Sequence, residues 1–194
     1  MVPGRYSAKL TAGGKTMSVP LVVKMDPRVK TSTADLERQF QLAAKLAAGI
    51  GEVSAAVQQA DDLQKQIAAR SKEAAGNAEV AAALAELEKK VSAAAGSGAG
   101  GGYGYFGFAV PGKEPTTLRQ VSTAFGALMG IIESADTAPT GDASAASEKW
   151  EAAGKSSLAR WEAIQTIELQ HANALLEKAH LQPLKTGENE KPKR

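Results

Sequence analysis

The sequence predicts a mainly α-helical fold, an antiparallel bundle of three to four helices preceded by a short β-hairpin. Apolar residues alternate with polar ones before residue 30, whereas after it they recur at spacings of three and four over long stretches. Alanine is abundant and only 5% of the 194 residues are aromatic, so the core must come from close contacts between helices rather than from large side chains.

Residues 1–29 predict the β-hairpin. Apolar and polar residues alternate over 6–11, and a turn at 12–15 leads into a second extended run over 16–25. A lone hairpin is only marginally stable in water, so these strands need a partner sheet. Pro-Gly-Arg-Tyr at 3–6 has the form of a turn that enters a late strand of an immunoglobulin-like sandwich, where a corner tyrosine bonds back to nearby backbone. We interpret the hairpin as a remnant of such a module.

Residues 30–95 predict a long helical hairpin. Hydroxyl side chains provide an N-cap for a helix over 33–73, and Gly-Asn at 76–77 ends it and caps the next helix. Gly49 and Gly51 each weaken the first helix by about 1 kcal/mol relative to alanine. The expected apolar stripes are Leu36, Phe40, Ala43, Ala47, Ile50, Val57, Leu63 and Ile67 in the first helix, and Val80, Leu84, Leu87 and Val91 in the second.

Residues 116–184 predict a second helical hairpin that completes the bundle. Thr117 and Gln120 form a capping-box pattern for a helix that ends before Pro139. A last helix is expected from about residue 144 to 180. Its apolar residues are Trp150, Leu158, Trp161, Ile164, Ile167, Leu175 and Leu176. The two tryptophans are eleven residues apart, close to three helical turns, so both rings can face one partner helix.

Residues 96–115 are predicted to form a glycine-rich crossover between the two helical hairpins. Its aromatic residues are Tyr103, Tyr105, Phe106 and Phe108. Flexible backbone interleaved with aromatic rings suits sugar stacking or contact with a partner. The alternative is a mobile crossover whose rings cover one end of the bundle, and the scarcity of aromatic residues elsewhere favours it. The polar residues 185–194 predict a disordered tail.

The sequence holds little that points to catalysis. His171 and His180 are the only histidines, and their separation of nine residues places them on opposite faces of the last helix, so they cannot share a metal. We interpret His171 as a partly buried polar residue. Glycine patterns at 96–101 and 14–16 resemble nucleotide-binding motifs but lack the strand-to-helix context that phosphate binding needs. Paired carboxylates indicate solvated helix surface. We expect no enzyme activity, no cofactor and no metal site.

Charge and hydropathy narrow the partners. The chain has 23 Lys and Arg against 21 Asp and Glu, and the two signs are interleaved, so nucleic acid is not an expected partner. There is no cysteine. The apolar runs fall short of the roughly 20 residues that span a bilayer, and the first residues do not begin a signal peptide. We therefore expect no transmembrane segment and no signal peptide within these residues.

Two stretches are distinctive, Lys-Met-Asp-Pro-Arg-Val at 24–29 and Ala-Asp-Thr-Ala-Pro-Thr at 135–140. The matching segments are residues 3–10, 22–29, 35–46, 134–140, 173–176 and 181–184. Together they resemble the C-terminal region of large secreted bacterial β-propeller proteins, the BNR-repeat or sortilin-like, glycosyl hydrolase-related proteins. The resemblance spans nearly the whole chain except the glycine-rich crossover and the tail.

The resemblance implies that a propeller and an immunoglobulin-like module precede this helical segment. Any hydrolase activity would belong to the propeller, so no catalytic residue is carried over. It implies a periplasmic or extracellular location and a non-catalytic accessory role in docking or assembly. The protein partner would be the propeller itself, a second copy or a larger assembly. The alternative function is a carbohydrate- or peptide-binding module that uses the aromatic crossover, which departs from the family pattern.

Overall fold

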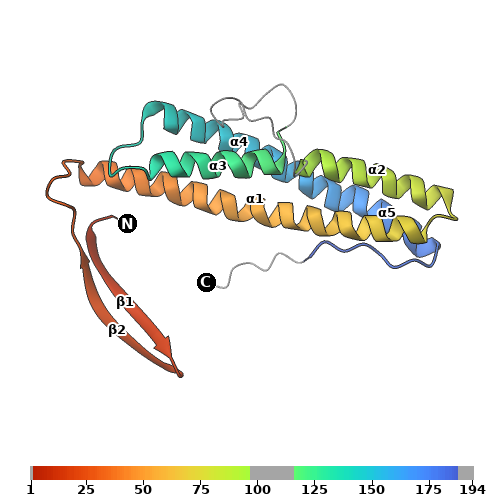
Figure 1. The fold of residues 1–194 in the computed structure, drawn as a ribbon, viewed down its shortest axis with the longest axis horizontal. Helices are drawn as coiled ribbons and strands as arrows, with labels where there is room; N and C mark the ends of the chain where they lie inside the picture. Colours follow the sequence, from red (N-terminus) through yellow and green to blue (C-terminus); the bar gives the residue numbers. More distant parts are fainter. Residues whose placement is uncertain (1, 97–115, 188–194) are drawn as a thin grey trace.

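The structure is a computed structural model of the chain, in which residues 2–96 and 116–187 are described. A β-hairpin is followed by α-helices and one π-helical turn, η1 (Figure 1). The elements are β1 (Gly4–Ala12), β2 (Lys15–Val23), α1 (Thr33–Glu73), α2 (Ala78–Ala95), α3 (Leu118–Ile132), α4 (Gly141–Ala163), η1 (Ile164–Glu168) and α5 (Leu169–Lys178). The predicted mainly α-helical fold with a preceding β-hairpin is confirmed.

The helix starts follow the capping signals in the sequence. The side chain of Ser32 caps α1 by accepting the Asp35 amide, and the side chain of Asn77 caps α2 in the same way. Thr117 and Gln120 form both hydrogen bonds of a capping box at the start of α3. Each cap satisfies amide groups that have no partner inside the helix, which is why these ends could be read from the sequence.

The last helix begins three residues earlier than the predicted residue 144. The hydroxyl of Thr140 accepts the Ala143 amide at 3.1 Å, so α4 starts at Gly141. From there α4, η1 and α5 form one continuous helical path to Lys178. Thr140 lies between Pro139 and Gly141, two residues that usually mark a loop.

The helices form a long rod with three helices at each level. Helix α1 runs the length of the rod, and the α4–η1–α5 path runs beside it (Figure 1). Helices α2 and α3 lie one after the other on the third side. We call the part made by α1, α3 and α4 the proximal half, and the part made by α1, α2 and α5 the distal half. The hairpin extends from the end of the proximal half.

Small residues set the packing of the proximal half. The ring of Phe125 on α3 lies against Gly49 of α1 and Gly154 of α4: a Cβ atom added at these glycines would lie 2.6 Å and 3.2 Å from ring carbons of Phe125. Ser147 and Ser157 of α4 are fully buried beside this contact. Because Gly49 and Gly154 carry no side chain, α1 and α4 can each pack closely against the Phe125 ring of α3.

The buried stripe of α1 differs from the predicted one. Phe40 is 52% exposed and Ala47 is also exposed, so their prediction as core residues is wrong. The buried residues of α1 are Leu36, Ala43, Leu46, Val53, Ala56, Ala60, Leu63 and Ile67. Leu46, Val53 and Ala60 are seven residues apart, which is the spacing of a helix in a bundle, and Phe40 and Ala47 lie one residue after that series. One residue turns a helix by about 100°, which carries both side chains to the outer surface.

The π turn shifts the buried face of the last helix by one residue. Trp161 and Ile164 are buried, and the next buried residue is Leu169, five positions later. An unbroken α-helix would instead bring the carboxylate of Glu168 inward. With the extra residue, Glu168 pairs with Lys90 at 2.6 Å on the surface. Ile167, predicted to be in the core, is 64% exposed.

The distal half is completed by a non-helical segment. After α5 the chain turns at His180, which has a φ of 57°, and runs back along the rod. We call residues 181–187 the C-terminal strap. Leu184 in the strap is 2% exposed and belongs to the core, and the Lys185 amide bonds the Gln66 side chain. The prediction of disorder from residue 185 is therefore wrong for 185–187, while residues 188–194 lie outside the described residues.

Candidate functional site

The described residues contain no grouping that fits a metal ion. Among residues 2–96 and 116–187, no three His, Asp or Glu side chains come together closely enough to hold one. His171 is exposed, so its interpretation as a partly buried residue is wrong. The reason is that Leu169 and Ala172 occupy the inner face of α5 and leave His171 between them on the outer face.

Four of the paired carboxylates in the sequence face a cation or an amide side chain. They are Asp61, Asp62, Glu88 and Glu168. Asp62 accepts a hydrogen bond from Lys65 at 2.9 Å, and this bond is the main reason that the pKa of Asp62 lies below its ordinary value. Asp61 pairs with Arg119 across two helices, with each side chain about one-third exposed. Both carboxylates therefore lie in ion pairs that are partly open to water.

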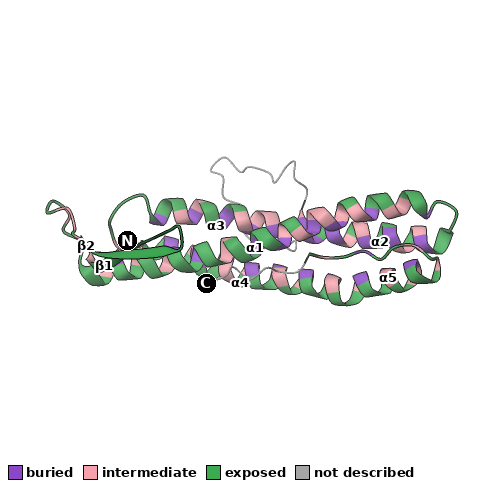
Figure 2. Ribbon diagram, turned by 90° about the horizontal axis from the view of Figure 1, so that it is seen from below, coloured by how far each residue is buried: buried purple, intermediate pink, exposed green. Residues whose placement is uncertain are grey.

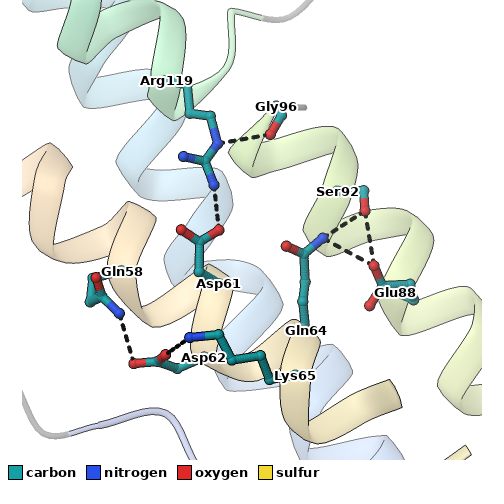
Figure 3. A network of polar contacts seen from close by, with 9 residues as sticks. All are labelled: Gln58, Asp61, Asp62, Gln64, Lys65, Glu88, Ser92, Gly96 and Arg119. Atoms are coloured by element: carbon teal, nitrogen blue, oxygen red, sulfur yellow. Dashed lines mark hydrogen bonds and ion pairs between the residues drawn. The ribbon is translucent and has the colours of Figure 1, made fainter. Parts of the chain in front are cut away.

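A layer of polar contacts joins the two halves of the rod (Figure 3). The Arg119 Nε donates to the carbonyl of Gly96 at 3.0 Å, while its guanidinium also bonds Asp61. One turn away, the Gln64 amide donates to Glu88 at 3.0 Å and to Ser92 at 2.8 Å. These bonds hold the end of α2 and the start of α3 against the middle of α1.

The same layer brings Gly96 close to Thr117, beyond which the chain is described again. Gly96 has a φ of +84°, and a Cβ atom there would lie 2.6 Å from the Thr117 hydroxyl, so the two flanking residues touch. On the other side the carbonyl of Thr116 accepts the Ser157 hydroxyl at 2.7 Å and a guanidinium nitrogen of Arg160. The four aromatic residues proposed for ligand contact, Tyr103, Tyr105, Phe106 and Phe108, lie outside the described residues.

A surface hollow of about 320 Å³ lies between α1, the start of α4 and the segment before it. It is lined by the cations Arg38 and Lys45 and by the carboxylates Glu148 and Glu151, together with Pro139. The opposite charges leave no net preference for an anion or a cation. We assign no ligand to this hollow.

Helix α1 is, among the described residues, the one helix long and apolar enough to cross a membrane by length and composition alone. Its buried residues form the core of the rod with α2, α3 and α4. Core helices pass the same test, so this finding is only weak evidence for a membrane span.

The β-hairpin carries an exposed apolar surface that no other described element covers. In the antiparallel register, Tyr6 pairs with Leu21 and Leu10 with Met17, which gathers the apolar side chains on one face. The residues of this apolar face are Tyr6, Ala8, Leu10, Met17, Val19, Leu21 and Val23. Its large side chains include Leu10 at 60% and Met17 at 65% exposure. Figure 2 shows the hairpin exposed along its length.

The opposite face of the hairpin is mostly polar. The hydroxyls of Ser7 and Ser18 lie 2.5 Å apart, and those of Thr11 and Thr16 lie 3.0 Å apart. Within the described part of the chain, β1 and β2 contact each other but no helix. The hairpin is therefore an amphipathic two-stranded sheet without a covering layer.

Tyr6 and Pro20 each give the hairpin a local feature. The Tyr6 hydroxyl donates to the carbonyl of Val2 at 2.5 Å, four residues upstream, as expected for the corner tyrosine of an immunoglobulin-like sandwich. Pro20 lies in the middle of β2. Proline cannot donate to a strand ladder and is found on edge strands, so β2 has the character of an edge strand and β1 that of an inner one.

Comparison with known proteins gives no relative. No family model, curated protein sequence or solved structure matches this chain. The resemblance to the C-terminal region of secreted β-propeller proteins therefore stays a prediction.

Proposed function

We propose that this chain is a non-catalytic interaction module whose β-hairpin docks onto an incomplete β-sandwich outside these residues. The single observation that carries the proposal is the apolar face of the hairpin, which has no covering layer although its side chains are half or more exposed at Leu10, Met17 and Val19. Exposed apolar faces of this kind mark interaction sites, and a two-stranded sheet needs further strands for stability.

The partner that fits is an immunoglobulin-like sandwich that lacks its last two strands. The corner bond of Tyr6 and the edge character of β2 are what the final hairpin of such a sandwich would have. The outer edge of β1 would pair with the next strand of the partner, and the apolar face would close the partner's core. On the resemblance, the sandwich belongs to a larger secreted β-propeller protein and acts in the periplasm or outside the cell.

The helical rod would act as the rigid part of this module. Helix α1 follows the hairpin after nine residues and spans 41 residues, so docking of the hairpin would direct a long rod away from the partner. A straight helix of this length extends about 60 Å. The rod would present its surfaces for assembly at a fixed distance from the docked sheet.

The test is hydrogen exchange of the full chain, alone and with a partner sandwich. The partner is an immunoglobulin-like sandwich of seven strands from which the last two have been removed, so that five remain. Alone, the amides of 4–23 should exchange almost without protection while core amides of α1 are protected. The added sandwich should slow exchange in the hairpin. Strong protection in the monomeric chain alone would contradict the proposal, because the hairpin would then need no partner.

Variants on the two faces of the hairpin separate docking from general effects. Leu10→Ser with Leu21→Ser should abolish the protection, whereas Arg5→Ser with Lys9→Ser on the other face should keep it. Light scattering over a range of concentrations tests whether a second copy of the chain is the partner instead. If the mass doubles and the hairpin amides become protected as the chain concentration rises, the partner is a second copy and not the sandwich.

A second candidate function is ligand binding by the aromatic crossover. The observation in its favour is that Gly96 and Thr117, the described residues near its two ends, are held together at the middle of the rod. Binding of soluble polysaccharides or peptides that is lost when Tyr103, Tyr105, Phe106 and Phe108 are all changed to alanine would support it. Equal binding by the variant would exclude this use of the crossover.

A further inference from the structure

In the distal half the strap links α1 and α5 through hydrogen bonds to Gln66 and Asn173. Helix α5 packs on α2, and α2 packs on α1, but the Cα atoms of α1 and α5 come no closer than 8 Å in the described structure. In the proximal half, by contrast, α1 and α4 contact each other directly. The C-terminal strap, residues 181–187, lies along α1 (Figure 1).

The strap is held mainly through its backbone. The Asn173 side chain donates to the Leu184 carbonyl at 2.9 Å and accepts the Leu184 amide at 2.7 Å. The Gln66 side chain does the same for Lys185, at 2.7 Å and 2.9 Å. Gln59 donates to the carbonyl of Gly187 at 3.2 Å. Three amide side chains from α1 and α5 thus bind main-chain groups of an extended segment. Such bonds do not depend on the side chains of that segment.

Leu184 is the one buried residue of the strap. Leu184 is 2% exposed and packs in the core, while Pro183 and Lys185 on either side of it are exposed. Main-chain hydrogen bonds that give affinity and one pocket that selects a side chain are the features of a site for an extended peptide.

We propose that the groove between α1 and α5 is a peptide-binding site for an extended segment with a leucine anchor. The strap occupies this site as an intramolecular ligand, and a segment of the same kind from a partner protein displaces it. This site is separate from the hairpin, so it gives the rod a second point of attachment at its far end. Only the strap, and not a helix of the bundle, has to move for the exchange.

The arithmetic of displacement sets the expected size of the effect. A short tether gives the strap an effective concentration of about 1 mM. If the separate peptide binds the vacant groove with a Kd of about 10 to 100 µM, the resident strap weakens its apparent affinity about 10- to 100-fold.

The experiment measures binding of a fluorescein-labelled peptide of residues 181–187 by polarisation. The full chain should bind it weakly. A chain that ends at Leu181 should bind it about 10- to 100-fold more tightly, and a full-length Leu184→Asp variant, whose strap lacks the anchor, should do the same. A chain that ends at Gly187 removes only residues 188–194 and should behave like the full chain.

Matched changes in the groove locate the binding. In the Leu184→Asp chain, Asn173→Ala or Gln66→Ala should reduce peptide affinity at least 10-fold, because each removes a pair of backbone bonds. Gln58→Ala is the control, since Gln58 lies on α1 but bonds only Asp62 on the outer surface among the contacts that the structure shows. A labelled peptide with aspartate in place of the leucine should not bind any of the chains.

Several outcomes would overturn the proposal. A folded Leu184→Asp chain that does not bind the peptide has no such site. Equal affinity for the full chain and the variants would place the peptide elsewhere. If both the shortened chain and Leu184→Asp unfold by circular dichroism, the strap is an obligatory part of the bundle and cannot be exchanged. None of these results bears on the docking of the hairpin, which is measured on other residues.

Discussion

The proximal and distal halves solve the same packing problem in different ways. Both are built on α1 and the α4–η1–α5 path, and both have a third helix. In the proximal half, Gly49 and Gly154 let α1 and α4 close around the ring of Phe125. In the distal half, α1 and α5 stay apart, and the strap with Leu184 links them.

The difference shows that the size of the side chain at a helix contact decides how closely the helices pack. Where the side chain is a single hydrogen, as at Gly49 and Gly154, two helices can each pack directly against the ring of Phe125 on the third. In the distal half, Gln66 bonds the backbone of the strap. Gln59 donates to the strap carbonyl of Gly187 and also accepts hydrogen bonds from Trp161 on α4 and Gln165 on η1. The first half is therefore a permanent contact, and the second has a part that can leave.

The largest effect is expected from Phe125→Ala in the proximal half. Phe125 is 3% exposed, and loss of its ring leaves a cavity between three helices. The free energy of unfolding, measured with urea, should fall by about 3–5 kcal/mol. Phe40→Ala is the control on the same rod: its ring is 52% exposed, so its cost should stay within about 0.5 kcal/mol. Equal losses of unfolding free energy for the two variants would show that the contact of Phe125 with Gly49 and Gly154 is not the centre of this core.

Two buried leucines of the distal half test whether the strap is separable. Leu63 on α1 is 0% exposed and Leu184 on the strap 2% exposed, so burial alone predicts equal losses. We expect Leu63→Ala to lower the free energy of unfolding by about 2–5 kcal/mol. Leu184→Ala should cost about 1–2 kcal/mol, because the strap can detach while the helices stay folded. Hydrogen exchange of the Leu184 and Lys185 amides should speed up in this variant without a change in α1, and a matching rise in α1 would contradict separability.

Gly49 and Gly51 form a matched pair that tests the close packing of α1 against Phe125 of α3. Gly51→Ala meets nothing within 4 Å and should stabilise the chain by about 0.5–1 kcal/mol through helix propensity. Gly49→Ala should instead destabilise it by about 1–2 kcal/mol, since its Cβ would lie 2.6 Å from the Phe125 ring. The check is thermal unfolding of both variants. Stabilisation by Gly49→Ala would mean that the ring can shift at no cost.

The smallest expected effect is the acid response of one carboxylate in each half. Hydrogen bonds from Ser32 and then Arg38 lower the pKa of Asp35 below its ordinary value of 3.8, and one from Lys65 lowers that of Asp62. A lowered pKa in the folded chain adds stability above about pH 3.8 that is lost as the pH falls through the folded value. Both groups are exposed, so the loss is small. Carboxyl carbon NMR should show both titrating below 3.8, and titration at or above that value would contradict these bonds.

The features that the sequence predicted are those with local causes. Caps at Ser32, Asn77 and Thr117 depend on residues three positions away, so the starts of α1, α2 and α3 could be read directly. The alternation in the hairpin likewise predicted its apolar face, and Tyr6 the corner bond. These are short-range patterns that a single sequence contains.

The features that it missed depend on distant partners. The bond between Gln66 and Lys185 joins residues 119 positions apart, and a glutamine on a helix gives no sign of it. The sequence treated Gly49 and Gly51 alike as weak points, although only Gly49 faces the Phe125 ring. The aromatic crossover was the one candidate site picked out by composition, and its rings lie outside the described residues.

The π turn between α4 and α5 gives the two halves of the rod separate registers. One extra residue in a helix advances everything after it by about 100°. The buried series Trp150, Ser157 and Ile164 therefore ends at η1, and Leu169 and Ala172 begin a new buried series in α5, which contacts α2. A one-residue deletion in η1 would rotate Asn173 away from the strap but leave the proximal contacts in place. The buried face of α5 can thus change without a change in the buried face of α4.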